Sequence, residues 1–140
     1  MNESCLIFSI AGRRYSLKSS LIQEIVHSAK VHPLPFVPDY VEGVVNCRGV
    51  AYTVVNVQKM PGGDGGGIEG ATVLVFKRED DQLAVHISNI ELFFEPEADD
   101  FKEDGVRYKK DFIPFFDADG IENALRRDLD RKSTRLNSSH

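Results

Sequence analysis

Short β-prone runs separated by turn residues constrain the fold of this chain more than any other feature. The runs are rich in β-branched and aromatic residues, and turn pairs such as Arg48-Gly49 join several of them into hairpins. The clearest runs are 5–10, 14–17, 40–46, 50–57, 72–76 and 82–87, with further ones at 90–94 and 112–116. Roughly nine or ten short strands at this spacing predict an all-β fold of the small-barrel type.

Two segments between these runs are predicted to be loops. Pro33, Pro35 and Pro38 exclude a central strand, because proline has no amide hydrogen for a β-ladder. Residues 61–67 read Pro-Gly-Gly-Asp-Gly-Gly-Gly, which predicts a flexible loop. A phosphate-binding loop is the alternative for this segment. The phosphate-binding loop is disfavoured because no Lys-Ser or Lys-Thr follows the glycines. The segment also does not lie between a strand and a helix.

A single convincing helix is predicted near the end of the chain. Asp119 lies three residues before Glu122, as in a capping box. The apolar residues that share one helical face are Ile121, Ala124, Leu125 and Leu129. Residues 131–140 are polar and without periodicity, so we expect a disordered or non-native tail after a single domain of residues 1–130. Ser20, three residues before Gln23, indicates a capped helical turn or the approach to a strand.

The composition of the chain indicates which class of molecule it can bind. A chain of 140 residues, 41% of them hydrophobic, can bury one continuous core. Its net charge of -5 argues against binding to nucleic acid or to anionic lipid, so proteins are the expected partners. No apolar run approaches the roughly 20 residues needed to cross a bilayer, and the N-terminus lacks the layout of a secretory signal. We therefore expect a cytoplasmic protein without direct membrane insertion.

The cysteines and histidines form no metal-binding or catalytic pattern. Cys5 and Cys47 each lie in an apolar stretch, which favours two buried reduced thiols over a disulfide or a metal site. His27 and His32 have no ligand partners at suitable spacing, so they are interpreted as surface residues. His86 is expected to face solvent from an apolar strand.

The carboxylates also give no catalytic grouping. Residues 117–120 resemble the start of a calcium loop, but the glycine comes two positions too early. The acidic residues between 91 and 104 are dense enough to repel one another, which favours a solvated loop over acid-base catalysis. The sequence therefore predicts no enzymatic activity, no cofactor and no metal.

One stretch is more specific. Residues 38–49 read Pro-Asp-Tyr-Val-Glu-Gly-Val-Val-Asn-Cys-Arg-Gly and are followed by Val-Ala-Tyr-Thr-Val-Val-Asn-Val. This resembles the signature of CheW-like domains, which has a Gly-Val pair, Asn-Leu-Arg-Gly, and a strand ending in Val-Asp-Leu. Here Cys47 replaces the leucine, Thr53 a frequent proline and Asn56 the aspartate.

The resemblance extends over about residues 5–127. Residues 83–93 resemble the Gly-Leu-Leu-Val-Asp-X-Val segment of the family, with Ala84 and Ser88 in place of its glycine and aspartate. The other matching segments are 8–10, 15–17, 22–25 and 112–117.

The resemblance implies both a fold and a role. The fold would be all-β, with two intertwined five-stranded barrels of the Src-homology type and a short C-terminal helix. The role would be that of a non-catalytic scaffold that couples methyl-accepting chemoreceptors to a CheA-type histidine kinase. One barrel surface would bind the kinase, and a groove between the barrels would receive the cytoplasmic hairpin tip of a receptor. The protein would then be recruited from the cytoplasm to receptor arrays.

Arg48 is the strongest candidate for a partner contact, because a guanidinium on a turn can bind carboxylates or carbonyls bidentately. A structural salt bridge across the barrel is its alternative role. Asn46 and Gly49 are expected to shape the turn, and Gly43 to permit a close backbone approach.

The same resemblance places other candidate residues around the receptor groove. Ile22 and Glu24 would lie near the groove, with Ile87 and Ile90 on its opposite wall. Core packing is the alternative for the three isoleucines.

Two other functions remain open from the sequence. A divergent CheW paralogue in a non-chemotaxis two-component pathway is suggested by the replacements at Cys47, Thr53, Asn56 and Ser88. A β-barrel that binds single-stranded nucleic acid would need aromatic platforms interleaved with a basic groove. The basic residues here are scattered and outnumbered, 17 against 22 acidic ones, which disfavours that function.

Overall fold

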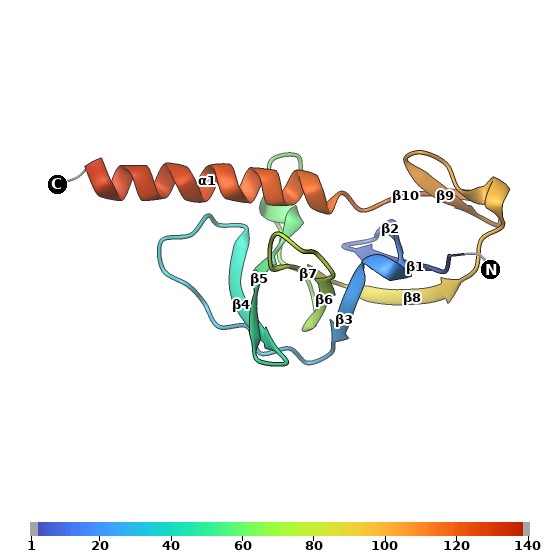
Figure 1. Cartoon of the computed structure of the whole chain (residues 1–140), viewed down its shortest axis with the longest axis horizontal. Coiled ribbons are helices and arrows are strands. Elements are labelled where there is room, and N and C mark those ends of the chain that lie inside the picture. The colour runs from blue at the N-terminus through green and yellow to red at the C-terminus, as the bar shows by residue number, and fades with distance from the viewer. Residues whose placement is uncertain (1–2, 139–140) are drawn as a thin grey trace.

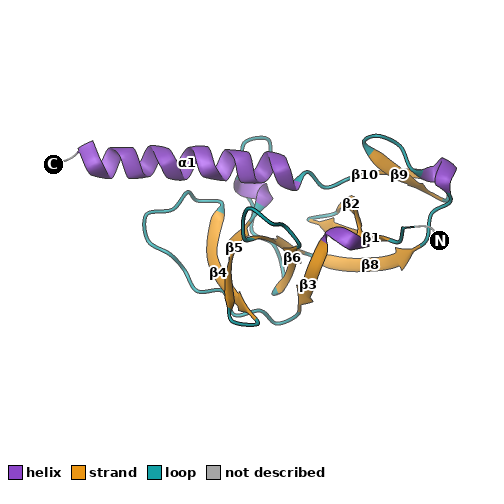
Figure 2. Ribbon diagram, viewed as in Figure 1, coloured by secondary structure: helices purple, strands orange, loops and turns teal. Residues whose placement is uncertain are grey.

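The strands predicted from the sequence are present in the computed structural model, which describes the backbone of residues 3–138 and the side chains of residues 3–129. Figure 1 shows the order of the elements, and Figure 2 shows that strands make up most of the regular structure. The strands are β1 (Cys5–Ile10), β2 (Arg13–Lys18), β3 (Ile22–Val26), β4 (Val41–Cys47), β5 (Val50–Val55), β6 (Thr72–Phe76), β7 (Leu83–Ile87), β8 (Asn89–Phe94), β9 (Gly105–Tyr108) and β10 (Asp111–Pro114). The helical elements are η1 (Ser19–Leu21), η2 (Val57–Lys59), η3 (Ala98–Asp100) and α1 (Ala118–Ser138).

Five strands form one sheet in the order β3-β6-β7-β5-β4. Its pairs are antiparallel except for β5 and β7, which run parallel. The proline-rich connector before β4 is a loop, as predicted, and it covers the outer edge of β4. The His32 N–H donates to the Val44 carbonyl at 2.8 Å, and the Val44 N–H donates to the His32 carbonyl at 2.9 Å.

The other five strands form a second group. β1 lies between β2 and β8, while β9 and β10 form a separate hairpin. Ser16 on β2 joins the two parts, because its hydroxyl donates to the Ile113 carbonyl at 3.0 Å and its carbonyl accepts from the Phe116 N–H at 2.9 Å. The structure therefore has the expected two five-stranded groups, although neither closes into a continuous hydrogen-bonded barrel.

One apolar core is shared by both groups and by α1. It contains Leu6 and Phe8 from β1, Leu74 from β6, Val85 from β7 and Leu125 from α1. A second, smaller cluster of buried side chains occupies the other face of the five-stranded sheet and consists of Val45, Val54, Val73, Val75 and Ala84. Because β6 and β7 contribute to both clusters, they are buried on both faces, which explains their nearly continuous apolar sequence.

The helix α1 differs from its prediction at both ends. Its N-terminal cap is Asp117, whose Oδ1 accepts from the Gly120 N–H at 2.9 Å, whereas the sequence suggested Asp119. Asp119 instead pairs with Arg78 across 2.9 Å. The backbone stays helical to Ser138, beyond the boundary predicted at 130. Loss of apolar periodicity does not end a helix by itself, and residues 121–138 contain no proline or glycine. Side chains from residue 130 onward lie outside the described part.

Local structure also differs from prediction in two short segments. The turn before β3 is the 3-10 helix η1, and it has no side-chain cap from Ser20. The strand β9 follows directly on the acidic loop and was not predicted. Among the described residues, no helix is long and apolar enough to span a membrane.

Candidate partner-binding surface

The β4–β5 turn presents Arg48 on a tightly defined backbone. Arg48 and Gly49 have φ angles of 54° and 83°, and Cys47 pairs with Val50 across the hairpin. Two consecutive positive φ angles are the signature of a two-residue type I′ turn, which suits the twist of a hairpin. The Asn46 Oδ1 accepts from the Gly49 N–H at 2.9 Å and fastens this turn, so the predicted roles of Asn46 and Gly49 in turn geometry agree with the structure.

Arg48 and Glu24 form an ion pair. The sequence allowed a salt bridge for Arg48 but did not predict Glu24 as its partner. The Arg48 Nε donates to the Glu24 Oε1 at 3.0 Å. Glu24 lies on β3 and Arg48 follows β4, which are opposite edge strands of the five-stranded sheet, so the pair connects the two edges. The Arg48 side chain is nevertheless 80% exposed, against 32% for Glu24. Arg48 therefore forms the ion pair while most of its side chain stays exposed to solvent.

Cys47 lies just beneath this ion pair. It is buried and free, as is Cys5, so both cysteines are the buried thiols that the sequence predicted. Burial raises the pKa of the Cys47 thiol, and the hydrogen bond to Glu24 and its negative charge raise it further. Burial likewise raises the pKa of the Cys5 thiol to about 11. Neither thiol is activated as a nucleophile, because both are held in the protonated form.

Gly43 belongs to the same strand as the turn but has a packing role. A Cβ at this position would lie 2.1 Å from the His32 carbonyl oxygen, and its φ angle is +144°. The close backbone approach predicted at Gly43 is therefore present. It brings the proline-rich loop against β4 rather than a partner.

The three isoleucine candidates divide into two groups. Ile87 is completely buried in the shared core, which agrees with the core-packing alternative and not with a place on the groove wall. It lies on β7, which is covered on both faces. Ile22 and Ile90 are partly buried and pack against the margin of that core, from β3 of one group and β8 of the other. These two remain partly accessible, one on each five-stranded group.

His86 was expected to face solvent, and this expectation is wrong. The side chain is only 8% exposed. Its Nδ1 lies 2.9 Å from the Glu42 carboxylate and its Nε2 lies 2.9 Å from the Gly70 carbonyl. Because both partners are acceptors, the ring binds them best as a doubly protonated imidazolium. The hydrogen bond to Glu42 raises the pKa of His86 against the opposing effect of burial.

The described side chains contain no group of three or more histidine, cysteine or acidic residues that could hold a metal ion. The titratable residues that do meet form ion pairs: Arg78 with Asp81 at 2.7 Å, Arg14 with Glu91 at 3.2 Å, and Arg48 with Glu24. These contacts give the residues involved a structural role.

Comparison with known proteins places the fold. A family model described as the CheW-like domain matches residues 4–117, which is most of the chain. The chain belongs to the CheW-like domain family. Among solved structures, it is similar to the scaffolding protein TtCheW from Thermoanaerobacter tengcongensis, with a TM-score of 0.74 and 15% sequence identity. That match covers 84% of this chain and 90% of the other. A search of curated proteins finds no match.

Membership assigns this CheW-like domain to a family of chemotaxis scaffolds rather than enzymes. Within the CheW-like stretch 38–49, residues 41–47 form β4, an edge strand of the five-stranded sheet. Residues 48–49 form the turn that carries the exposed Arg48. Sequence reasoning found Arg48, Asn46 and Glu24 individually. Arg48 and Glu24 meet only because the two edge strands of the sheet come together. No local sequence pattern predicts this contact.

Proposed function

We propose that this CheW-like domain couples methyl-accepting chemoreceptors to a CheA-type histidine kinase, by binding both. It would act in the cytoplasm and be recruited to receptor arrays at the membrane. The observation that carries this proposal is the exposed guanidinium of Arg48 on a rigid turn.

Arg48 is prepared for contact with a partner protein. Its Nε is occupied by Glu24, and neither Nη atom has a hydrogen bond among the described residues. The positive φ angle of Arg48 is unfavourable for a residue with a side chain, and the Asn46–Gly49 bond holds the turn in this form. Little side-chain or backbone freedom is then lost on binding, which favours recognition of a carboxylate or carbonyl on a partner protein.

Ile22 and Ile90 support a second contact, for the receptor. Both are partly buried and pack against the core that the two five-stranded groups share. Partly exposed apolar side chains on rigid strands suit the apolar face of a helical hairpin tip. Ile87 is left out of this contact because it lies wholly inside the core.

Co-purification tests the proposal. The full chain is offered to a panel of CheA-type kinase regulatory domains and chemoreceptor cytoplasmic fragments, and capture of both classes is expected. Arg48→Glu should fold normally, since an exposed ion pair contributes at most about 1 kcal/mol, and should weaken capture by about tenfold or more. Normal capture by this variant would remove Arg48 from the contact surface.

A charge-swapped double variant separates the two roles of Arg48. Glu24→Arg combined with Arg48→Glu restores an ion pair between β3 and the turn but reverses its polarity. If Arg48 contacts the partner, the double variant stays defective. Recovery of capture would show instead that the arginine acts only through its salt bridge. Thermal unfolding of each variant checks that the fold is retained.

A divergent paralogue serving a non-chemotaxis two-component pathway is the second candidate. Two of the replacements that suggest it are accommodated locally: the Ser88 hydroxyl accepts from the Ala11 N–H at 2.8 Å, and the Asn56 amide both donates and accepts a hydrogen bond. Capture of neither kinases nor receptors in the panel would contradict coupling and favour this candidate.

A further inference from the structure

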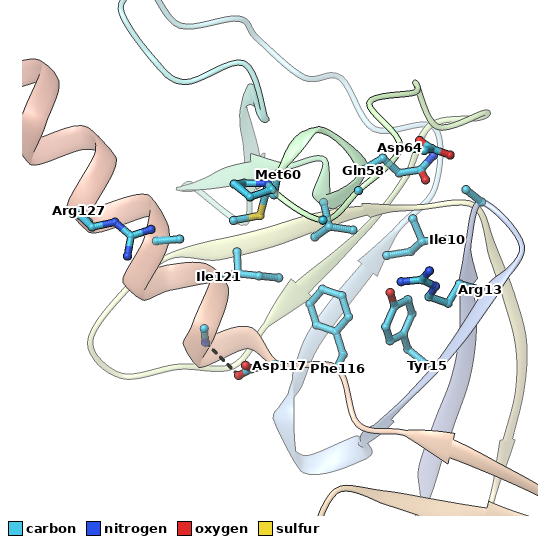
Figure 3. A pocket seen from close by; sticks show the side chains of 17 residues that line it. Ile10, Arg13, Tyr15, Gln58, Met60, Asp64, Phe116, Asp117, Ile121 and Arg127 are labelled. Atoms are coloured by element: carbon cyan, nitrogen blue, oxygen red, sulfur yellow. Dashed lines mark hydrogen bonds between the residues drawn. The ribbon is translucent and has the colours of Figure 1, made fainter.

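A cleft of about 660 Å³ opens between α1, the β1–β2 hairpin and the segment around η2. Figure 3 shows its lining side chains. This volume lies within the range of small-molecule binding sites, about 300–1,000 Å³. The cleft is distinct from the Arg48 surface: Tyr40, just before β4, donates to Asp128 of α1, while Arg48 follows the far end of that strand.

The middle of the cleft is apolar. Met60, just after η2, and Ile121 of α1 face it, and Ile10 and Phe116 complete the surface (Figure 3). Phe116 is held rigidly, since it packs against the rings of Phe8, Tyr15 and Phe76 at centroid distances of 5.3–5.7 Å. A preformed apolar wall of this kind suits a short hydrocarbon chain or a small ring.

Polar groups without partners gather at one end. Arg13 and Tyr15 lie beside each other there (Figure 3). Among the described residues, Arg13 makes no ion pair and the Tyr15 hydroxyl makes no hydrogen bond. A guanidinium next to a phenol offers several donors to one planar anion.

The acidic residues of the cleft are already occupied by backbone donors. The Asp117 Oδ1 accepts from the Gly120 N–H at 2.9 Å, and the Asp64 Oδ1 accepts from the Gly66 N–H at 2.8 Å. Their negative charges disfavour a second anionic group, and Asp117 already caps the N-terminus of α1. Arg127 also lines the cleft, but it is paired with Asp128 across 3.8 Å. Arg13 is therefore the unpaired cation of the described lining, and a single carboxylate beside it fits better than a phosphate or dicarboxylate.

We propose that this cleft binds a small organic monocarboxylate, with its carboxylate at Arg13 and Tyr15 and its apolar body between Met60 and Ile121. This inference does not depend on the proposed coupling function, because it uses none of the residues assigned to receptor or kinase.

Titration of the ¹⁵N-labelled full chain with hexanoate tests the proposal. We expect the amide shifts of lining residues on η2, the β1–β2 hairpin and the start of α1 to move saturably. Hexanamide, which has the same shape without the charge, should bind about tenfold more weakly, since a charge-assisted bond is lost. Equal affinity for the two probes, shifts confined to other surfaces, or no saturation would overturn the proposal.

Three variants locate the site. Arg13→Gln should lower hexanoate affinity about tenfold, and Ala124→Phe should abolish binding by filling the cleft. Arg126→Gln is the matched control, because Arg126 is exposed on α1 and does not line the cleft. Retention of wild-type affinity by Arg13→Gln, or an equal loss in Arg126→Gln, would show that the carboxylate is not bound as proposed. Unchanged amide shifts away from the cleft confirm that each variant is folded.

Discussion

The buried polar side chains each have a specific structural task. Ser16, Asn56 and His86 are at most 8% exposed, and all of them are hydrogen-bonded. A buried polar group without a partner would cost about 1–3 kcal/mol, so such residues specify the geometry around them. Asn56 fastens the glycine-rich loop: its Nδ2 donates to the Gly66 carbonyl at 3.2 Å and its Oδ1 accepts from the Gln58 N–H at 2.9 Å.

Asn56→Asp should therefore destabilise the fold, although aspartate is the usual residue of the family signature. The carboxylate cannot donate to the Gly66 carbonyl, and it adds a buried charge. We expect a loss of about 2 kcal/mol in the free energy of unfolding, measured by urea denaturation. Asn46→Asp is the matched control, because an exposed carboxylate there still accepts from the Gly49 N–H; a comparable loss in this control would contradict the explanation.

His86 should make stability depend on pH. Its pKa is raised above the ordinary value of 6.5 by Glu42. The stabilising effect is then complete below about pH 6.5 and is lost as the pH rises through the folded-state pKa. We expect the difference in unfolding free energy between wild type and His86→Gln to be largest at acidic pH and to shrink towards alkaline pH. The exposed His27→Gln serves as control, and a pH-independent difference would refute the pairing.

At the level of elements, we expect substitutions of the two glycines on the β4–β5 hairpin to lower the free energy of unfolding by different amounts. Gly49→Ala should cost about 1 kcal/mol, because the backbone is left-handed but the space is open. Gly43→Ala should cost about 3 kcal/mol, because its Cβ would also collide with the His32 carbonyl. Chemical denaturation of the two variants compares them. Equal losses would mean that the loop does not press against β4 as described.

The elements also show what the sequence predicts and what it does not. Arg48-Gly49 predicted its hairpin because turn chemistry is local, and the three prolines predicted their loop for the same reason. The partners of His86 are Glu42 on β4 and Gly70 in the loop before β6, and the partner of Arg48 is Glu24 on β3. The burial of Ile87 likewise follows from cover on both faces of β7. Contacts distant in the sequence therefore escaped prediction, as did the lining of the cleft.

For the whole molecule, the shared core implies one cooperative domain. Leu125 is the buried anchor of α1, and Tyr40 fastens the helix through Asp128. We propose that residues 1–130 constitute this domain and that residues 131–140 add nothing to its stability.

A chain ending at residue 130 tests this proposal. Its free energy of unfolding should stay within about 0.5 kcal/mol of the full chain, whereas Leu125→Ala should lose about 2–4 kcal/mol. A truncated chain as unstable as Leu125→Ala would place the last ten residues within the domain. Thermal and urea unfolding curves give both values.

The pairing of β1 with β8 has a consequence for synthesis on the ribosome. The strand β1 must wait until residues 89–94 emerge before it gains its second neighbour, and Ser16 must wait for residues 113–116. The sheet of residues 22–87 is complete before either event. Nascent chains should therefore assemble from the middle outward, with the N-terminal hairpin docking last.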